Sequence, residues 1–252
     1  MKALVFAAGL GTRLRPLTDN MPKALVPIAG KTLLEWQIRK LKDAGINDII
    51  VNVHHFPDMI IDFLHAHNNF GCNIMVSDER DMLLDTGGGL LKALRTFANE
   101  ADEPVMALNV DILSTIRIEE VMAAYNPQSL GLLVVSERKT QRYLCFDDDN
   151  RLVGWTNVAT GEMKPANSTS IRHNSSIHLL AFSGMQVLSA DVLPLLENFA
   201  VERGAKFSVI DFYLWLVEKQ SASLYACTMN VPLMDVGKIN HLSEAEDFAR
   251  TL

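Results

Sequence analysis

The order of the expected secondary-structure elements predicts an α/β fold: a Rossmann-like three-layer α/β/α arrangement with a mainly parallel sheet and inserted β-hairpins. In the first half of the chain, short apolar runs of β type alternate with helical patterns. These runs are apolar at successive positions, as expected for parallel strands that are covered on both faces. The 252 residues, of which 48% are hydrophobic and 21% charged, are sufficient for a single packed domain over 1–252.

The first half is predicted to consist of four strands that alternate with helices. Apolar residues that share one helical face predict a helix over 31–44, which ends at Gly45. The remaining elements are strands at 2–8, 49–53, 73–77 and 105–109 and helices at 57–67 and 87–99. Ligands of such sheets bind beyond the carboxyl ends of the strands. Asn52, Asp78 and Asp111 fall at those ends.

The second half changes character, and hairpins are expected there. Two strands within 143–155 are joined by the acidic run Asp147–Asp149, which is typical of a hairpin turn and less typical of a metal site. A polar loop is predicted over 156–174. The other elements are strands at 130–135, 176–182 and 223–228, one or two helices within 185–202, and helices at 207–219 and 238–252.

Charge and cysteine usage narrow the classes of partner. The net charge of −7 argues against general binding to nucleic acid or to a membrane surface, and no apolar stretch approaches the ~18 residues of a membrane helix. The three cysteines are scattered and have no metal-ligand spacing, so free buried thiols in a reducing compartment are expected. No targeting segment is recognisable at the N-terminus, so we expect a cytoplasmic protein.

The strand at 2–8 runs directly into a glycine-containing turn that carries cations. The turn reads Gly9-Leu-Gly11-Thr12-Arg13, and Pro22-Lys23 follows it. Glycines allow a ligand to approach the backbone closely, and N–H groups in such a turn can face an anion. Arg13 offers a planar fork and Lys23 a point charge to phosphate oxygens. This segment is therefore predicted to hold a polyphosphate.

Two common glycine motifs are absent from this turn. The dinucleotide fingerprint G-x-G-x-x-G would need a third glycine where Leu14 stands, which argues against a dinucleotide-dependent oxidoreductase. The Walker pattern fails because Thr12 and Arg13 follow Gly11. The remaining pattern, G-x-G-T-R-x-x-P-x-T followed by P-K, closely resembles the signature of the sugar-1-phosphate nucleotidyltransferases, which form nucleotide-sugars and release pyrophosphate.

The resemblance extends over nearly the whole chain and implies one nucleotidyltransferase catalytic domain over 1–252. The short stand-alone members, such as the N-acetylmuramate-1-phosphate uridylyltransferases and mannose-1-phosphate guanylyltransferases, are the most similar. The substrates implied are a nucleoside triphosphate and a sugar-1-phosphate. The implied catalytic residues are Arg13, Lys23 and Asp111, and the implied nucleotide-binding residues are Ala8, Gly9, Gly11, Thr12, Arg13, Lys23, Asp85, Gly87 and Gly88.

Nucleotidyl transfer also implies a divalent metal. The attacking oxygen belongs to the sugar phosphate, so no Ser, His or Cys nucleophile is needed. Mg²⁺ prefers oxygen ligands and keeps several waters, so one or two carboxylates suffice. The resemblance assigns this role to Asp111 and Asp235, although Val110 stands where the family has Gly and Leu233 where it has Trp.

The remaining family segments border the base and the sugar. Gly87–Gly89 opens a predicted helix, where each glycine costs about 1 kcal/mol relative to Ala, so close approach of a flat ligand is one explanation and a flexible helix start is the other. The implied sugar-phosphate-binding residues are Asn109, Gly184 and Lys206. The family's E-K-P lysine has no clear counterpart, although Lys164 precedes a proline.

Two alternatives stay open: a choline-phosphate-type cytidylyltransferase and a non-catalytic, nucleotide-sensing relative. The sequence specifies neither the base, nor the sugar, nor the oligomeric state.

Overall fold

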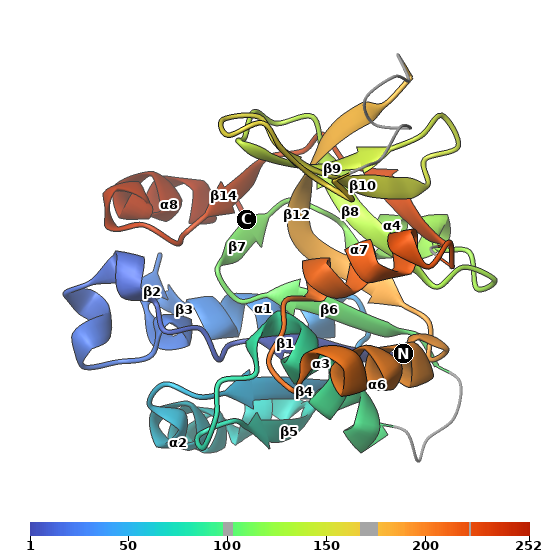
Figure 1. Cartoon of the computed structure of the whole chain (residues 1–252). Coiled ribbons are helices and arrows are strands. Elements are labelled where there is room, and N and C mark those ends of the chain that lie inside the picture. Colours follow the sequence, from blue (N-terminus) through green and yellow to red (C-terminus); the bar gives the residue numbers. More distant parts are fainter. Residues whose placement is uncertain (98–102, 167–175, 222) are drawn as a thin grey trace.

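The computed structural model describes residues 1–97, 103–166, 176–221 and 223–252 (Figure 1). Its main feature is a ten-stranded sheet in which one path runs β11-β10-β9-β12-β6-β1-β4-β5, while β8 pairs with β12 and β13 pairs with β8. Helices cover both faces of this sheet, so the predicted α/β fold with a mainly parallel central sheet and inserted hairpins is confirmed.

The parallel part is formed by β1 (Lys2–Phe6), β4 (Asp48–Val53), β5 (Asn73–Asp78) and β6 (Val105–Asn109). In the register of β1, Phe6 lies between Asn52 of β4 and Asn109 of β6. The carboxyl ends of these strands therefore meet at one edge, and the candidate site lies there.

The antiparallel part is arranged around the long strand β12 (His178–Leu188). β12 pairs with β6, with β8 (Gly131–Ser136) and with β9 (Arg142–Phe146). The hairpin of β9 and β10 (Leu152–Asn157) turns at the acidic run, where the Asp147 side chain accepts hydrogen bonds from the backbone of Asp149 and Arg151. The predicted hairpin turn is thus confirmed. In the same sheet β11 (Glu162–Lys164) pairs with β10, and β13 (Leu224–Thr228) pairs in parallel with β8.

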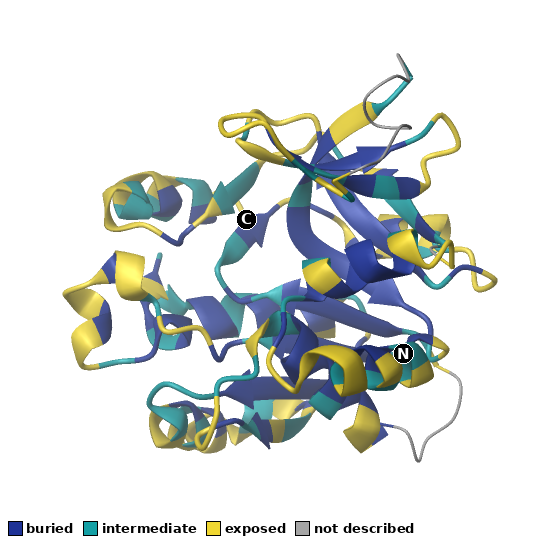
Figure 2. Ribbon diagram, viewed as in Figure 1, coloured by how far each residue is buried: buried dark blue, intermediate teal, exposed yellow. Residues whose placement is uncertain are grey.

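Two layers of helices bury the sheet because β1 and β4 send alternate residues to opposite faces. Ala3, Val5, Ile49 and Val51 join one apolar cluster, whereas Leu4 and Ile50 join the other. Figure 2 shows the central strands in dark blue, the colour of buried residues. The first cluster contains side chains of α1 (Leu33–Asp43), α2 (Pro57–Ala66), α4 (Ile118–Ala124) and α8 (Leu242–Ala249). The second contains side chains of α3 (Asp85–Phe97), α6 (Val192–Arg203) and α7 (Val209–Glu218).

Two short ribbons lie outside the main sheet. β2 (Pro27–Ile28) pairs with β3 (Lys31–Thr32), and β7 (Ile112–Ser114) pairs with β14 (Leu233–Asp235). The β7–β14 ribbon matters for function, because Asp235 ends β14 and Asp111 directly precedes β7.

Several predicted boundaries are wrong. Residues 185–188, predicted as helix, belong to β12, because pairing with β6 on one side and β8 on the other overrides the local helical pattern. Within the predicted loop 156–174 the structure instead has the end of β10 and all of β11. Helix α4 was not predicted at all. Residues 98–99 of the predicted helix and 167–174 of the predicted loop lie outside the described residues.

The three cysteines are free and buried, as the sequence predicted. In the part of the chain that the structure describes, no helix is both long and apolar enough to cross a membrane.

Candidate active site

The glycine turn after β1 is held by a threonine of the same motif. Gly11 has a φ of 63°, and its carbonyl oxygen accepts a hydrogen bond from the Thr18 hydroxyl at 2.8 Å. A Cβ on Gly11 would lie 2.9 Å from the Thr18 side chain and 3.0 Å from Cβ of Lys23. Gly11 is therefore required by both its left-handed backbone and its close neighbours, and the turn brings Lys23 beside it.

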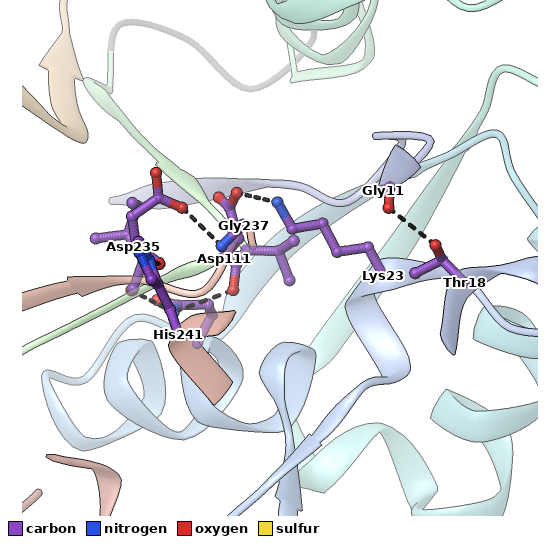
Figure 3. A network of polar contacts seen from close by, with 10 residues as sticks. Gly11, Thr18, Lys23, Asp111, Asp235, Gly237 and His241 are labelled. Carbon is purple, nitrogen blue, oxygen red and sulfur yellow. Dashed lines mark hydrogen bonds and ion pairs between the residues drawn. The ribbon is translucent and has the colours of Figure 1, made fainter. Parts of the chain in front are cut away.

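Lys23 reaches across the site to the first predicted metal ligand. Its ammonium donates to the Asp111 carboxylate, although the two residues are 88 positions apart (Figure 3). Lys23 is only 8% exposed, so its charge is balanced by a carboxylate instead of by bulk water. The structure thus unites the cation of the N-terminal signature with the carboxylate that follows β6.

The β7–β14 ribbon brings the second predicted metal ligand alongside the first. The backbone N–H of Val236 donates to the carbonyl oxygen of Asp111 at 2.9 Å, and Asp235 pairs with Ile112, so Asp235 lies beside the start of β7, next to Asp111. The Asp235 carboxylate accepts a hydrogen bond from the N–H of Gly237 at 2.7 Å (Figure 3). A Cβ on Gly237 would lie 2.7 Å from a guanidinium nitrogen of Arg13. Only a glycine therefore lets Arg13 pack beside Asp235.

These four side chains fit a hydrated divalent cation. Asp111 and Asp235 supply two carboxylates, which are the hard oxygen ligands that Mg²⁺ prefers, and its other positions are commonly filled by water and substrate phosphate. The described residues contain no cluster of three or more His, Cys, Asp or Glu side chains that could hold a metal without such additional ligands. Arg13 and Lys23 place two further positive charges next to this pair.

A buried polar network supports the end of β1. The sequence predicted that Asn52 lies at this edge, but not that its side chain binds the backbone. The side-chain oxygen of Asn52 accepts hydrogen bonds from the N–H groups of Ala7 at 2.7 Å and Ala8 at 3.2 Å. The Asn52 amide nitrogen donates to the carboxylate of Glu79 at 2.8 Å, and the N–H of Leu84 donates to its second oxygen at 3.1 Å. Burial raises the pKa of Glu79, and these hydrogen bonds oppose that rise. The Ala8 N–H is thus engaged within the protein.

The glycine run at the start of α3 is explained by the chain itself. A Cβ on Gly87 would lie 2.3 Å from the Phe207 ring, and one on Gly88 would lie 2.2 Å from the carbonyl oxygen of Ala205. One on Gly89 would lie 2.8 Å from the Asn52 amide. The carbonyl oxygen of Phe207 also accepts hydrogen bonds from the N–H groups of Gly87 at 2.9 Å and Gly88 at 3.3 Å.

The predicted reason for the glycine run, close approach of a ligand, is therefore corrected. What approaches is the segment 205–207, which also caps the helix. Nor do these glycines serve a left-handed backbone, because the left-handed residue at this turn is Asp85, with a φ of 62°. Nucleotide binding by Asp85, Gly87 and Gly88 stays a prediction.

Two of the three predicted sugar-phosphate residues lie together. Gly184 has a φ of 72° at a bulge of β12, and a Cβ there would lie 3.0 Å from the side-chain nitrogen of Asn109. Such bulges often occur next to active sites. Lys206 instead lines a separate cavity of about 300 Å³ with Lys164 and Asp211.

A second group of cations near Phe182 was also missed. Arg138 donates to the carbonyl oxygen of Phe182 at 2.7 Å. Arg138, Arg142 and Lys164 line a cavity of about 380 Å³ together with Phe182. In the sequence these residues follow no motif, and only the Lys164-Pro165 pair gives a hint.

Paired carboxylates and two cations at the carboxyl edge of a parallel sheet are groups of the kind that suit a divalent metal ion and a polyphosphate. The comparisons then give the family. The chain belongs to the nucleotidyl transferase family, whose model matches residues 2–251.

Curated relatives carry more specific names. The chain is 37% identical over 145 residues to the N-acetylmuramate alpha-1-phosphate uridylyltransferase of Caulobacter vibrioides, covering 55% of this chain and 59% of the relative. It is 38% identical over 139 residues to the mannose-1-phosphate guanyltransferase of Gibberella zeae, covering 54% of this chain and 38% of the relative. The matched region thus spans well under two thirds of either relative.

Solved structures share the fold over the whole chain. A putative glucose-1-phosphate thymidylyltransferase from Bacillus anthracis superposes with a TM-score of 0.80 at 18% identity, covering 100% of this chain and 96% of that one. HddC from Yersinia pseudotuberculosis superposes with a TM-score of 0.74 at 22% identity, covering 98% of this chain and 99% of that one.

Proposed function

We propose that this chain is a sugar-1-phosphate nucleotidyltransferase that converts a nucleoside triphosphate and a sugar-1-phosphate into an NDP-sugar and pyrophosphate. The observation that carries the proposal is the contact between Lys23 and Asp111, which joins the cationic N-terminal signature to the carboxylate after β6. Membership of the nucleotidyl transferase family supports it.

The chemistry follows from the charges at this edge of the sheet. An oxygen of the sugar phosphate attacks the α-phosphorus in line, the bond from that phosphorus to the bridging oxygen breaks, and pyrophosphate leaves. Arg13 and Lys23 lie where they can bind the triphosphate oxygens and stabilise the negative charge of the transition state. The backbone of Gly9, Gly11 and Thr12 would follow the phosphates in the turn.

A Mg²⁺ ion bound by Asp111 and Asp235 would neutralise phosphate charge and orient the substrates. Two carboxylates support this assignment: Asp111 directly before β7 and Asp235 at the end of the paired strand β14. They leave room in the coordination sphere of Mg²⁺ for phosphate oxygens and water. Asn109 and Gly184, at the end of β6 and the bulge of β12, are proposed to border the sugar.

The test is a substrate panel with pyrophosphate release as the readout. Each of the four nucleoside triphosphates is combined with N-acetylmuramate-1-phosphate, mannose-1-phosphate, glucose-1-phosphate and choline phosphate. The names of the relatives place UTP with N-acetylmuramate-1-phosphate and GTP with mannose-1-phosphate first.

The matched control is the Asp111→Asn variant, since a neutral amide is a poorer ligand for a hard cation. We expect the wild-type protein to turn over one of the sugar-1-phosphates and the Asp111→Asn variant to lose that turnover. Turnover of choline phosphate with CTP alone would indicate the cytidylyltransferase alternative. Nucleotide binding without turnover of any pair would indicate the nucleotide-sensing alternative and overturn the proposal.

A further inference from the structure

The β7–β14 ribbon contains Asp235 and directly follows Asp111, and among the described residues β7 pairs with another strand along one edge only. Along this edge the backbone carbonyl oxygen of Asp111 accepts a hydrogen bond from the N–H of Val236. The N–H of Thr115 donates to the carbonyl oxygen of Pro232 at 3.1 Å. Alternate residues of an extended strand direct their backbone groups to opposite edges. The carbonyl groups of Ile112 and Ser114 therefore face away from β14.

Two side chains of α1 bind that opposite edge. The side-chain nitrogen of Gln37 donates to the carbonyl oxygen of Ile112 at 2.8 Å. The ammonium of Lys40 donates to the carbonyl oxygen of Ser114 at 2.8 Å and to its hydroxyl at 2.9 Å. Residues three apart lie on the same face of a helix, and the strand carbonyls that they bind are two residues apart. Gln37 and Lys40 thus occupy the place of a third strand.

Apolar packing supports this edge only in part. A cavity of about 560 Å³ lies beside it, lined by Lys40, by Leu113 and Ser114 of β7 and by the segment that leads into α4. Gln37 is 2% exposed, so its hydrogen bonds are formed away from water. Where packing is incomplete, directed hydrogen bonds fix the position of the strand.

We propose that Gln37 and Lys40 are positioning residues, which fix the β7–β14 ribbon so that Asp111 and Asp235 bind a divalent cation together. The proposal rests on the proposed function in one respect: these two carboxylates are taken to hold the metal. Substitution of groups that hydrogen-bond to metal ligands directly typically weakens metal affinity 10- to 100-fold. Gln37 and Lys40 act one step further away, through the backbone of β7, so the lower end of this range is expected.

This role can be separated from plain stabilisation. Burial of the Lys40 ammonium costs free energy of desolvation. Replacement of Lys40 by methionine, which has a similar length, should therefore leave the melting temperature nearly unchanged. The metal affinity should nevertheless fall, because the carbonyl and hydroxyl of Ser114 lose their donor. A purely structural role predicts the reverse, a lower melting temperature with unchanged affinity.

The experiment measures Mn²⁺ binding to the purified full chain by electron paramagnetic resonance of the free ion, at a temperature well below melting. Lys40→Met and Gln37→Met are compared with wild type, with Asp111→Asn, and with Arg39→Met as the matched control. Arg39 is adjacent on α1 and lines the same cavity, but its guanidinium bonds to Glu35. We expect the Mn²⁺ dissociation constant to rise about tenfold in the two test variants. It should stay within about twofold in Arg39→Met, since among the described residues Arg39 contacts Glu35 and the Phe70 ring and forms no hydrogen bond with β7.

The outcomes distinguish this proposal from the proposed function. If Asp111→Asn binds Mn²⁺ as wild type does, the metal assignment itself is wrong. If Asp111→Asn loses binding while Lys40→Met and Gln37→Met retain it, the positioning role is overturned and the metal site stands. The positioning role is also overturned if Lys40→Met and Gln37→Met lose both Mn²⁺ binding and the native near-UV circular dichroism signal, because the effect would then be general unfolding.

Discussion

The Gly88→Ala substitution, which adds a methyl group, tests two explanations of the glycine run: packing against the segment 205–207 and close approach of a ligand. In the structure the added Cβ would lie 2.2 Å from the Ala205 carbonyl oxygen, so the segment 205–207 or the start of α3 must shift. Overpacking of this kind costs about 1–3 kcal/mol, and better helix propensity returns up to about 1 kcal/mol. We expect Gly88→Ala to lower the free energy of unfolding by about 1–2 kcal/mol and the melting temperature by about 2–8 °C.

Gly9→Ala is the matched comparison. A Cβ on Gly9 meets no atom within 4 Å, and its backbone needs no left-handed conformation, so its melting temperature should not change. If Gly9 faces the nucleotide as proposed, this variant should instead raise the Michaelis constant for the nucleotide. For both variants, differential scanning fluorimetry measures the melting temperature and initial rates give the Michaelis constant for the nucleotide. A Gly88→Ala protein that melts like wild type but binds nucleotide weakly would refute the packing explanation.

Three further predictions concern the charged groups. Arg13→Ala and Lys23→Ala should each lower turnover by at least ~10²-fold, because each removes a cation that is proposed to bind the triphosphate. Unchanged rates in pyrophosphate-release assays would contradict the phosphate assignment. Chelation of divalent ions should abolish activity, and Asp235→Asn should raise the Mg²⁺ concentration needed for half-maximal rate, whereas a chelated enzyme at full rate would exclude the metal. Burial lowers the pKa of Lys40 to about 8, so the unfolded chain binds more protons than the folded one between about pH 8 and 10.5. Wild type should therefore gain stability relative to Lys40→Met as pH rises through that window, and parallel urea titrations at pH 7 and 9.5 would show whether it does.

The parts of this protein that face the proposed ligands were predictable because they are encoded as side-chain types at fixed spacing. Arg13, Lys23, Asp111 and Asp235 each come from a recognisable segment, and the structure brings them to one edge of the sheet. The parallel strands were predictable because burial on both faces leaves continuous apolar runs. The length of β12 was not, since pairing with β6 and β8 decided it instead of local pattern.

The supporting residues could not be predicted, and the reason lies in their partners. Asn52 binds the N–H groups of Ala7 and Ala8, and Gln37 binds the carbonyl oxygen of Ile112. Backbone groups are the same at every residue, so a side chain that binds them leaves no matching partner to find in the sequence. In the sequence a buried Asn or Gln looks the same as an exposed one. The glycines follow the same logic: Gly88 and Gly237 are explained by the Ala205 carbonyl and by Arg13, two neighbours that only the fold brings close. Motif residues therefore identify the chemistry, whereas the geometry that aligns them depends on contacts that become visible only in three dimensions.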